Sequence, residues 1–227
     1  MEIKFIGTGG AFDFNKGTAA AIVKVAGKKI LIDCGYSTLP ILANKDLAKD
    51  IDHILITHLH GDHIGSLSTL LPYLQIKLNN NASIITPTEE FQNELHQFFT
   101  VTYEAKRANY VPITDFPEIG FVDTSNQHVE GMASFAYYFS EDNQLIYYSG
   151  DIGNADTAKN FLDTRKESNI TVFHETTPRT DMAVHASYRE VQEKLKGYET
   201  YVYHIAKENM PEDCTLKYLE DYPEFLA

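Results

Sequence analysis

The sequence has no apolar run that approaches the roughly 18 residues needed to cross a bilayer. Its first residues also lack the basic and apolar stretches of a secretory signal. These two absences argue against membrane insertion and export, and they predict a cytoplasmic protein without a membrane partner. Cysteine is scarce as well, because Cys34 and Cys214 are the only two and show no Cys-x-x-Cys spacing. Two isolated cysteines cannot form a disulfide framework, so both are expected to be reduced packing residues.

Positive charge is also in short supply. The 19 Lys and Arg residues stand against 32 Asp and Glu residues, which leaves a net charge of −13. Proteins that bind long nucleic acids usually present a basic patch, because neutralisation of the phosphates supplies most of the affinity. No such patch is present here. An extended nucleic acid is therefore not an expected partner, unless bound metal supplies positive charge locally.

The chain also lacks low-complexity tracts, Pro/Ser-rich linkers and internal repeats, so residues 1–227 are expected to form a single domain. Strand-like segments come first in hairpins, with a turn at Gly27-Lys28, and later alternate with helix-like segments. Strands are predicted at 3–6, 20–25, 29–32, 53–56, 83–85, 119–122, 133–139, 145–148, 171–173 and 201–204. Helices are predicted at 39–49, 64–73, 89–99, 155–166, 188–196 and 212–220. This order predicts an α+β protein in which two sheets pack face to face with helices outside.

The most informative segment is residues 57–63, with the sequence THLHGDH. In extended backbone the side chains of His58 and His60 point to the same side, and Gly61 then allows a turn into Asp62 and His63. Imidazole and carboxylate groups together suit zinc, and also iron or manganese. The alternative is a solvated surface cluster. Crowded imidazoles would repel one another when protonated, and they have no apolar packing role, so a metal site is the favoured interpretation.

This His-x-His-x-Asp-His pattern after a strand resembles the signature of the metallo-β-lactamase superfamily. The similarity extends over nearly the whole chain, because residues 5–10 (FIGTGG) resemble the opening strand and turn of the ribonuclease Z and phosphodiesterase branch. Residues 32–35 (IDCG) resemble a structural Asp-x-Gly element of the family. The resemblance implies a four-layer αβ/βα sandwich of two mixed sheets flanked by helices, with a two-metal site at one edge.

The resemblance also implies three ligands outside the motif. His128 is the match for a third His on the first metal, Asp151 in residues 148–153 (YSGDIG) for a bridging Asp, and His204 for a late His after the last strand. The implied cofactors are two divalent ions, zinc first, with manganese or iron as alternatives. The implied ligand sets are His58, His60 and His128 for one ion, and Asp62, His63 and His204 for the other, with Asp151 bridging both.

Two later elements, residues 173–176 (FHET) and 185–187 (HAS), resemble motifs of the ribonuclease Z branch, although their sequences depart from the usual motifs. The resemblance implies that His185 acts on the scissile phosphate, while Asp62 orients the attacking water. The alternative for His185 is a position beside the helix cap Ser187. The roles of Glu175 and Arg179 stay open, and a solvated loop position is favoured for Arg179.

Together these features predict a hydrolase in which two metal ions activate water for attack on a small or cyclic phosphodiester. Only 22 residues separate His128 from Asp151, which leaves room for a hairpin but not for the tRNA-binding arm of ribonuclease Z enzymes. The rivals are a thioesterase or lactonase of the glyoxalase II type and a metal-binding protein without turnover. Residues 100–117 are either a lid over the site, with Tyr103, Lys106, Arg107 and Tyr110, or a surface connection. The sequence leaves a homodimer open.

Overall fold

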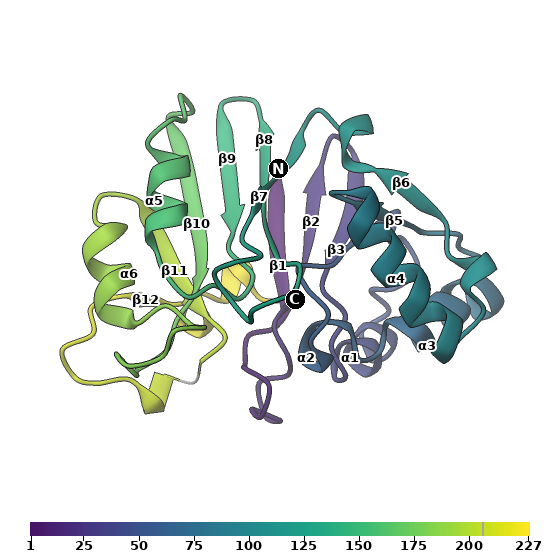
Figure 1. The fold of residues 1–227 in the computed structure, drawn as a ribbon, viewed down its shortest axis with the longest axis horizontal. Coiled ribbons are helices and arrows are strands. Elements are labelled where there is room, and N and C mark those ends of the chain that lie inside the picture. Colours follow the sequence, from purple (N-terminus) through teal and green to yellow (C-terminus); the bar gives the residue numbers. More distant parts are fainter. Residues whose placement is uncertain (206) are drawn as a thin grey trace.

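The computed structural model describes residues 1–205 and 207–227, which form two sheets of six strands each (Figure 1). The strands of the first sheet lie in chain order: β1 Glu2–Gly7, β2 Ala20–Val25, β3 Lys28–Ile32, β4 His53–Leu55, β5 Ser83–Thr86 and β6 Tyr110–Pro112. The second sheet runs in order from β12 to β7, and its strands are β7 Ile119–Asp123, β8 Phe135–Glu141, β9 Gln144–Tyr148, β10 Asn169–Glu175, β11 Glu199–Tyr203 and β12 Lys217–Tyr218.

The two sheets follow the same plan. Each starts with three antiparallel strands, β1-β2-β3 or β7-β8-β9. Each then continues with parallel strands. The predicted hairpin between β2 and β3 is confirmed, but its turn lies one residue earlier than predicted: Ala26 and Gly27, and not Gly27 and Lys28, form it. Their φ angles are 47° and 73°, as a tight two-residue hairpin turn requires. Because parallel strands end at the same edge of a sheet, the loops after β9, β10 and β11 lie together, and a 3.0 Å hydrogen bond from the N–H of Phe135 on β8 to the carbonyl of Thr57 joins the segment after β4 to the second sheet.

Helices cover the outer faces of the sheets (Figure 1). On the first half lie α1 Thr38–Asn44, α2 Gly61–Ile64, α3 Leu67–Pro72 and α4 Glu89–Thr102, and on the second half α5 Asp156–Leu162 and α6 Tyr188–Lys194. The longest, α4, begins where the hydroxyl of Thr88 accepts a hydrogen bond from the backbone N–H of Phe91. Its buried residues Phe91, Leu95 and Phe99 recur every four positions and so share one face. This order of helices, two sheets and helices is the predicted four-layer sandwich.

Aromatic side chains fill the space between the sheets. The ring of Phe5 on β1 lies 5.9 Å from Tyr148, 5.2 Å from Phe173 and 5.4 Å from Tyr203, centroid to centroid. The hydroxyl of Tyr137 on β8 donates a 2.8 Å hydrogen bond to the carbonyl of Ile56, just after β4. The interface between the sheets therefore fixes the end of β4, where the metal-ligand motif begins.

Three details of the sequence interpretation need correction. The helix predicted at 212–220 is wrong, because this segment pairs with β11 as the edge strand β12 (Tyr201 opposite Lys217) and ends in a 3₁₀ turn, Leu219–Asp221. Strand pairing outweighs the weak helical pattern there. The helix predicted at 39–49 ends at Asn44, since Asp46 adopts a φ of 55°. Residues 100–117 contain the outer strand β6 and the turns Ala105–Arg107 and Ile113–Asp115.

Both cysteines are free, and Cys34 is buried. Within the described parts of the chain, no helix combines the length and the apolar composition that crossing a membrane requires.

Candidate metal centre

The ligand motif starts at the end of β4 and finishes in α2. His60 caps the helix in extended backbone, and Gly61 opens it, so Asp62 and His63 lie in its first turn. His58 and His63 are completely buried, whereas His60 is partly exposed. The strand and the short helix thus aim four polar side chains at the edge of the sandwich.

The first ligand set combines three imidazoles with one carboxylate. Nδ1 of His60 lies 2.9 Å from Nε2 of His58 and 3.1 Å from Nε2 of His128. Both of those Nε2 atoms lie 4.0 Å from Oδ2 of Asp151. Nitrogen ligands at a tetrahedral zinc ion are about 3.3 Å apart, given Zn–N bonds of about 2.0–2.1 Å. The converging nitrogens therefore have nearly the spacing that a metal ion requires.

The second ligand set shares Asp151 with the first. Nε2 of His63 lies 3.4 Å from Oδ2 of Asp62 and 3.4 Å from Oδ1 of Asp151. Nε2 of His204 lies 3.3 Å from Oδ2 of Asp62 and 3.6 Å from Oδ2 of Asp151. The structure thus brings together all seven residues that the sequence singles out, and the carboxylate of Asp151 stands between the two sets.

Hydrogen bonds on the far side of the rings determine which nitrogen is free for a metal. Nδ1 of His63 donates to Oδ2 of Asp33 at 2.8 Å, and Nδ1 of His128 donates to the carbonyl of Val184 at 2.8 Å. The hydroxyl of Thr57 lies 3.1 Å from Nδ1 of His58 and donates to Asp33. Each of these rings therefore directs its Nε2 into the cluster, the arrangement found in metal-ligating histidines.

Tight backbone geometry delivers the ligands. His204 and Asp33 have φ angles of 65° and 61°, a left-handed conformation that side chains other than Gly seldom adopt. The N–H of His204 donates to the carbonyl of Thr8 at 2.7 Å, which holds this turn in place. A Cβ atom at Gly35 would lie 1.8 Å from the carbonyl oxygen of Asp62. Only glycine at position 35 lets the motif pass this close to the end of β3.

Burial and mutual charge set the protonation of the cluster. Burial, reinforced by repulsion from His63, holds the pKa of His58 well below its usual range. Burial alone would also lower the pKa of His63, but the carboxylates of Asp151 and Asp33 outweigh it and raise that pKa well above its usual range. Burial favours the neutral acid at Asp151, yet His204 and His63 hold its pKa well below its usual range. The buried carboxylate is thus ionised and depends on positive charge beside it.

The residues fit divalent metal ions. Nε2 of His63 and Oδ1 of Asp151 are buried, and among the described residues neither atom has a hydrogen-bond partner. Both atoms face the shared centre of the second ligand set. Buried polar atoms normally find a partner, so their convergence is explained by a bound cation. The mixed imidazole and carboxylate donors suit zinc, manganese or iron.

A third cluster adjoins the ligands and contains Glu175, His185 and His204. Oε1 of Glu175 accepts hydrogen bonds from the backbone N–H groups of Ile152 and Ala186, at 3.2 and 3.1 Å. The same oxygen lies 3.4 Å from Nδ1 of His185. His185 and His204 also line a cavity of about 880 Å³. The cluster therefore connects the candidate metal centre to an open space large enough for a small ligand.

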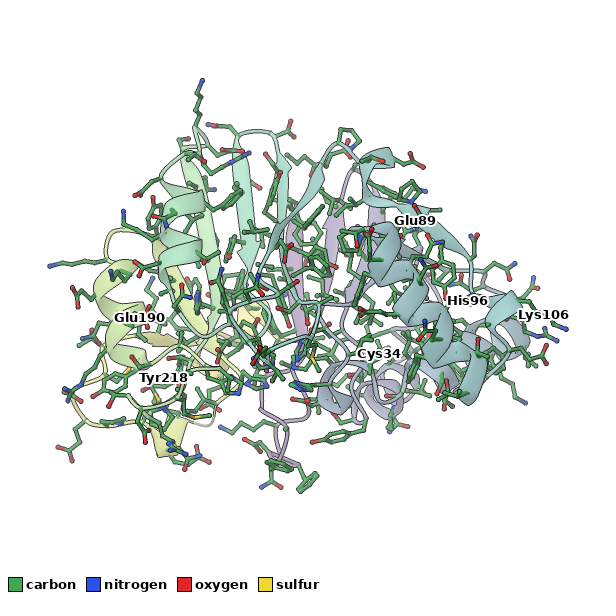
Figure 2. All side chains as sticks on the ribbon, viewed as in Figure 1. Cys34, Glu89, His96, Lys106, Glu190 and Tyr218 are labelled. Carbon is green, nitrogen blue, oxygen red and sulfur yellow. The ribbon has the colours of Figure 1, made fainter. Side chains whose placement is uncertain are left out.

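The remaining predicted residues lie away from the ligands. Arg179 is exposed and pairs with Asp181 at 3.0 Å, so it is a solvated loop residue. His53 contacts Ser83 at 2.8 Å, and His96 lies exposed on α4 (Figure 2). Figure 2 also shows Lys106 at the outer end of the first half, and residues 100–117 do not border the cavity in the described part of the chain. This segment is a surface connection.

Sequence reasoning missed how the ligands are supported. It identified Asp33 only as a structural residue, although its carboxylate orients both His63 and Thr57. A usable signal was present, because Asp33 directly follows β3, which is the neighbour of β4 in the sheet.

Solved structures share this architecture. The metallo-β-lactamase fold protein YhfI from Bacillus subtilis superimposes with a TM-score of 0.70 over 89% of this chain and 85% of its own, at 19% identity. The short form of human tRNase Z superimposes with a TM-score of 0.64 over 92% of this chain and 95% of its own, also at 19% identity. The protein has the metallo-β-lactamase fold.

The sequence comparisons define the family more narrowly. The family described as Anti-Pycsar protein Apyc1 matches residues 1–215. The Anti-Pycsar protein Apyc1 of Paenibacillus harenae is 27% identical over an alignment of 210 positions, and the match covers 84% of this chain and 83% of that relative. The chain belongs to the Anti-Pycsar protein Apyc1 family.

We expect about two metal ions per chain from elemental analysis of protein produced in metal-replete medium. Asp151→Ala should lose both ions and all turnover, because this carboxylate lies in both ligand sets. Asp115→Ala, at an exposed carboxylate, is the matched control and should keep its metal. Circular dichroism would verify that both variants are folded. If wild-type protein produced in metal-replete medium contains no metal, the assignment is contradicted.

The stabilisation by metal should grow with pH. In metal-free protein, protons on His63 and His204 offset the charge of Asp151, because the pKa values of both imidazoles are raised. The contribution of these protons to the stability of the metal-free fold is complete below the usual imidazole pKa of about 6.5. It is lost as the pH rises through the raised pKa values. Metal competes with the same protons and binds better as pH rises. The difference in Tm between metal-loaded and chelator-treated protein should therefore widen from pH 6 to pH 8. A constant or shrinking difference would contradict this account.

Proposed function

We propose that the chain is a metal-dependent hydrolase of small phosphodiesters, with cyclic nucleotides among its substrates. The observation that carries the proposal is the position of Asp151, shared by two ligand sets next to a cavity that His185 also lines. Two neighbouring cation sites beside a small-molecule cavity suit attack of water on a phosphodiester.

The side chains divide into holding and reacting groups. His58, His60 and His128 would hold one ion, and Asp62, His63 and His204 the other, with Asp151 between them. Bound divalent ions would supply Lewis-acid chemistry and lower the pKa of a water molecule. The carboxylate of Asp62 is positioned to orient that water, because its Oδ2 faces the second ligand set.

His185 would act as the general acid. Burial alone would lower its pKa, but Glu175 and more distant carboxylates outweigh burial and raise the pKa of His185 to about 9. In the metal-free protein the imidazole is then the doubly protonated cation at neutral pH. Glu175 is anchored by two backbone N–H groups and keeps the ring facing the cavity. From there His185 can stabilise negative charge on phosphate or protonate the leaving oxygen.

Several features favour a small substrate over tRNA. The net charge is −13, and residues between His128 and Asp151 form the plain hairpin β8–β9 without an inserted arm. A cavity of about 880 Å³ falls within the usual range for small-molecule sites, about 300–1,000 Å³. The short form of human tRNase Z, which has a similar fold, is named for its action on tRNA. That name supports phosphodiester chemistry for this chain, but it gives no information on the size of the substrate.

His185→Ala should keep both metal ions and lose roughly 10²–10⁴-fold in turnover, the usual span for a positioned acid or base. His96→Ala, at an exposed imidazole on α4, is the matched control and should retain wild-type turnover. Metal content and kcat are measured on the same preparations. Loss of an ion from His185→Ala would show that His185 is a metal ligand. The roles proposed for His185 and His204 would then have to be exchanged.

A substrate panel tests the proposed function directly. Metal-loaded protein should hydrolyse bis(p-nitrophenyl) phosphate and a 3′,5′-cyclic nucleotide, and should process precursor tRNA poorly. Asp151→Ala prepared in parallel controls for contaminating enzymes. Assays at low and moderate salt are informative, because an enzyme that binds a long phosphate backbone loses affinity steeply as salt rises. Efficient, salt-sensitive cleavage of precursor tRNA would refute the small-substrate proposal. Turnover of a thioester or lactone without phosphodiesters would place the protein in the rival class.

A further inference from the structure

The loop between β1 and β2 presents two exposed aromatic rings. Phe12 is 89% exposed and Phe14 is 77% exposed. The loop projects beyond the body of the molecule at the bottom of Figure 1, between the two halves of the sandwich. Large apolar side chains placed together in water usually mark a contact surface.

The base of this loop is well ordered by hydrogen bonds. The N–H of Gly9 donates to the carbonyl of Gly17 at 2.8 Å, and a carboxylate oxygen of Asp13 accepts from the N–H groups of Asn15 and Lys16 at 3.2 Å each. The ring of Phe14 lies 6.1 Å from that of Tyr36, centroid to centroid. The two phenyl groups are therefore held out by a structured turn and not by a loose chain.

The same loop forms one wall of the cavity at the candidate metal centre. Phe12 and Phe14 line this space together with His185 and His204. A Cβ atom at Gly10 would lie 2.9 Å from the carbonyl oxygen of His204, so the start of the loop packs directly against a predicted ligand. Thr176, Thr177, Pro178 and Met182 also line this cavity. A molecule that fills this cavity with its phosphate at His185 would therefore lie beside these residues and the two rings.

The chemistry of the lining favours a planar, uncharged group beside the phosphate. Asp13 and Glu208 line the cavity and would repel a second phosphate. The ammonium group of Lys16 lies 3.5 Å from the carboxylate of Glu208, so the positive charge of Lys16 is already partly neutralised. Asn15 and Asn209 also line the space, and a side-chain amide can both donate and accept hydrogen bonds. Aromatic rings with nearby amide groups are suited to a nucleobase, which offers a flat face and a polar edge.

We propose that Phe12 and Phe14 form a stacking surface for the base of a nucleoside phosphodiester whose phosphate lies at His185. This inference rests on the proposed function and adds a specificity site to it. Stacking on an aromatic ring is tolerant of base identity, so the loop would select for the presence of a base and not for one particular base.

A fluorescence experiment tests the contact without turnover. The chain contains no tryptophan, so Phe12→Trp and Phe14→Trp each introduce a single reporter. The ligand is a nucleoside monophosphate, which carries a base and is the product class of the proposed reaction, and ribose 5-phosphate is the comparator without a base. The nucleotide should quench either reporter saturably and ribose 5-phosphate should not. Ile76→Trp and Val101→Trp, at exposed apolar positions on the first half, are matched controls and should show no saturable quenching.

Kinetics separate this inference from the proposed function. Phe12→Ala and Phe14→Ala should raise KM for a 3′,5′-cyclic nucleotide by about 5-fold to 160-fold, the range expected for one stacking contact, and should change kcat far less. Phe12→Tyr and Phe14→Tyr should restore KM. Failure of the wild-type protein to cleave cyclic nucleotides would overturn the proposed function. Cleavage with unchanged KM in both alanine variants, and no quenching, would overturn the stacking surface alone. If the wild-type protein is a dimer and the alanine variants are monomers with unchanged KM, the rings belong to an interface between copies of the chain. That result would also overturn the stacking surface.

Discussion

The burial of the Asp151 carboxylate is the constraint on which the site depends. An ionised carboxylate away from water is costly unless opposite charge lies beside it, and here His63 and His204 are close enough to supply it. Protons on these imidazoles and divalent ions between the ligands are two ways to meet the same electrostatic requirement. The hydrogen bonds that His63 and His128 donate to Asp33 and to the carbonyl of Val184 favour the divalent ions, because they leave Nε2 of both rings directed inward.

The sandwich provides the distances that this charge balance requires. One group of ligands follows β4 in the first sheet, whereas Asp151 and His204 follow β9 and β11 in the second. The separation of the two groups is therefore set by the aromatic packing around Phe5 and by the bond from Tyr137 to the end of β4. A loss of packing between the sheets would move ligands that belong to different sheets relative to one another.

The sequence was informative where chemistry is concentrated in a short motif and less so where it depends on distant contacts. His58 to His63 form a dense local pattern, and Asp151 and His204 follow predicted strands, so their meeting could be anticipated. The link from Asp33 to His63 spans 30 residues and leaves no local pattern. The edge strand β12 was mistaken for a helix because its pairing with β11, and not its own periodicity, determines its conformation. The exposed rings of Phe12 and Phe14 acquire meaning only beside the cavity.

The division of the ligands between two sheets has a consequence for biosynthesis. The ribosome completes the segment from His58 to His63 long before it reaches His204, and at that stage each ligand set has only two of its members. A zinc or manganese ion that met this nascent segment would be held weakly, since its other ligands come from strands not yet made. Firm capture of metal has to wait until the second sheet docks on the first. Metal uptake would therefore be a late event in the maturation of the chain, and it would report that both halves have come together.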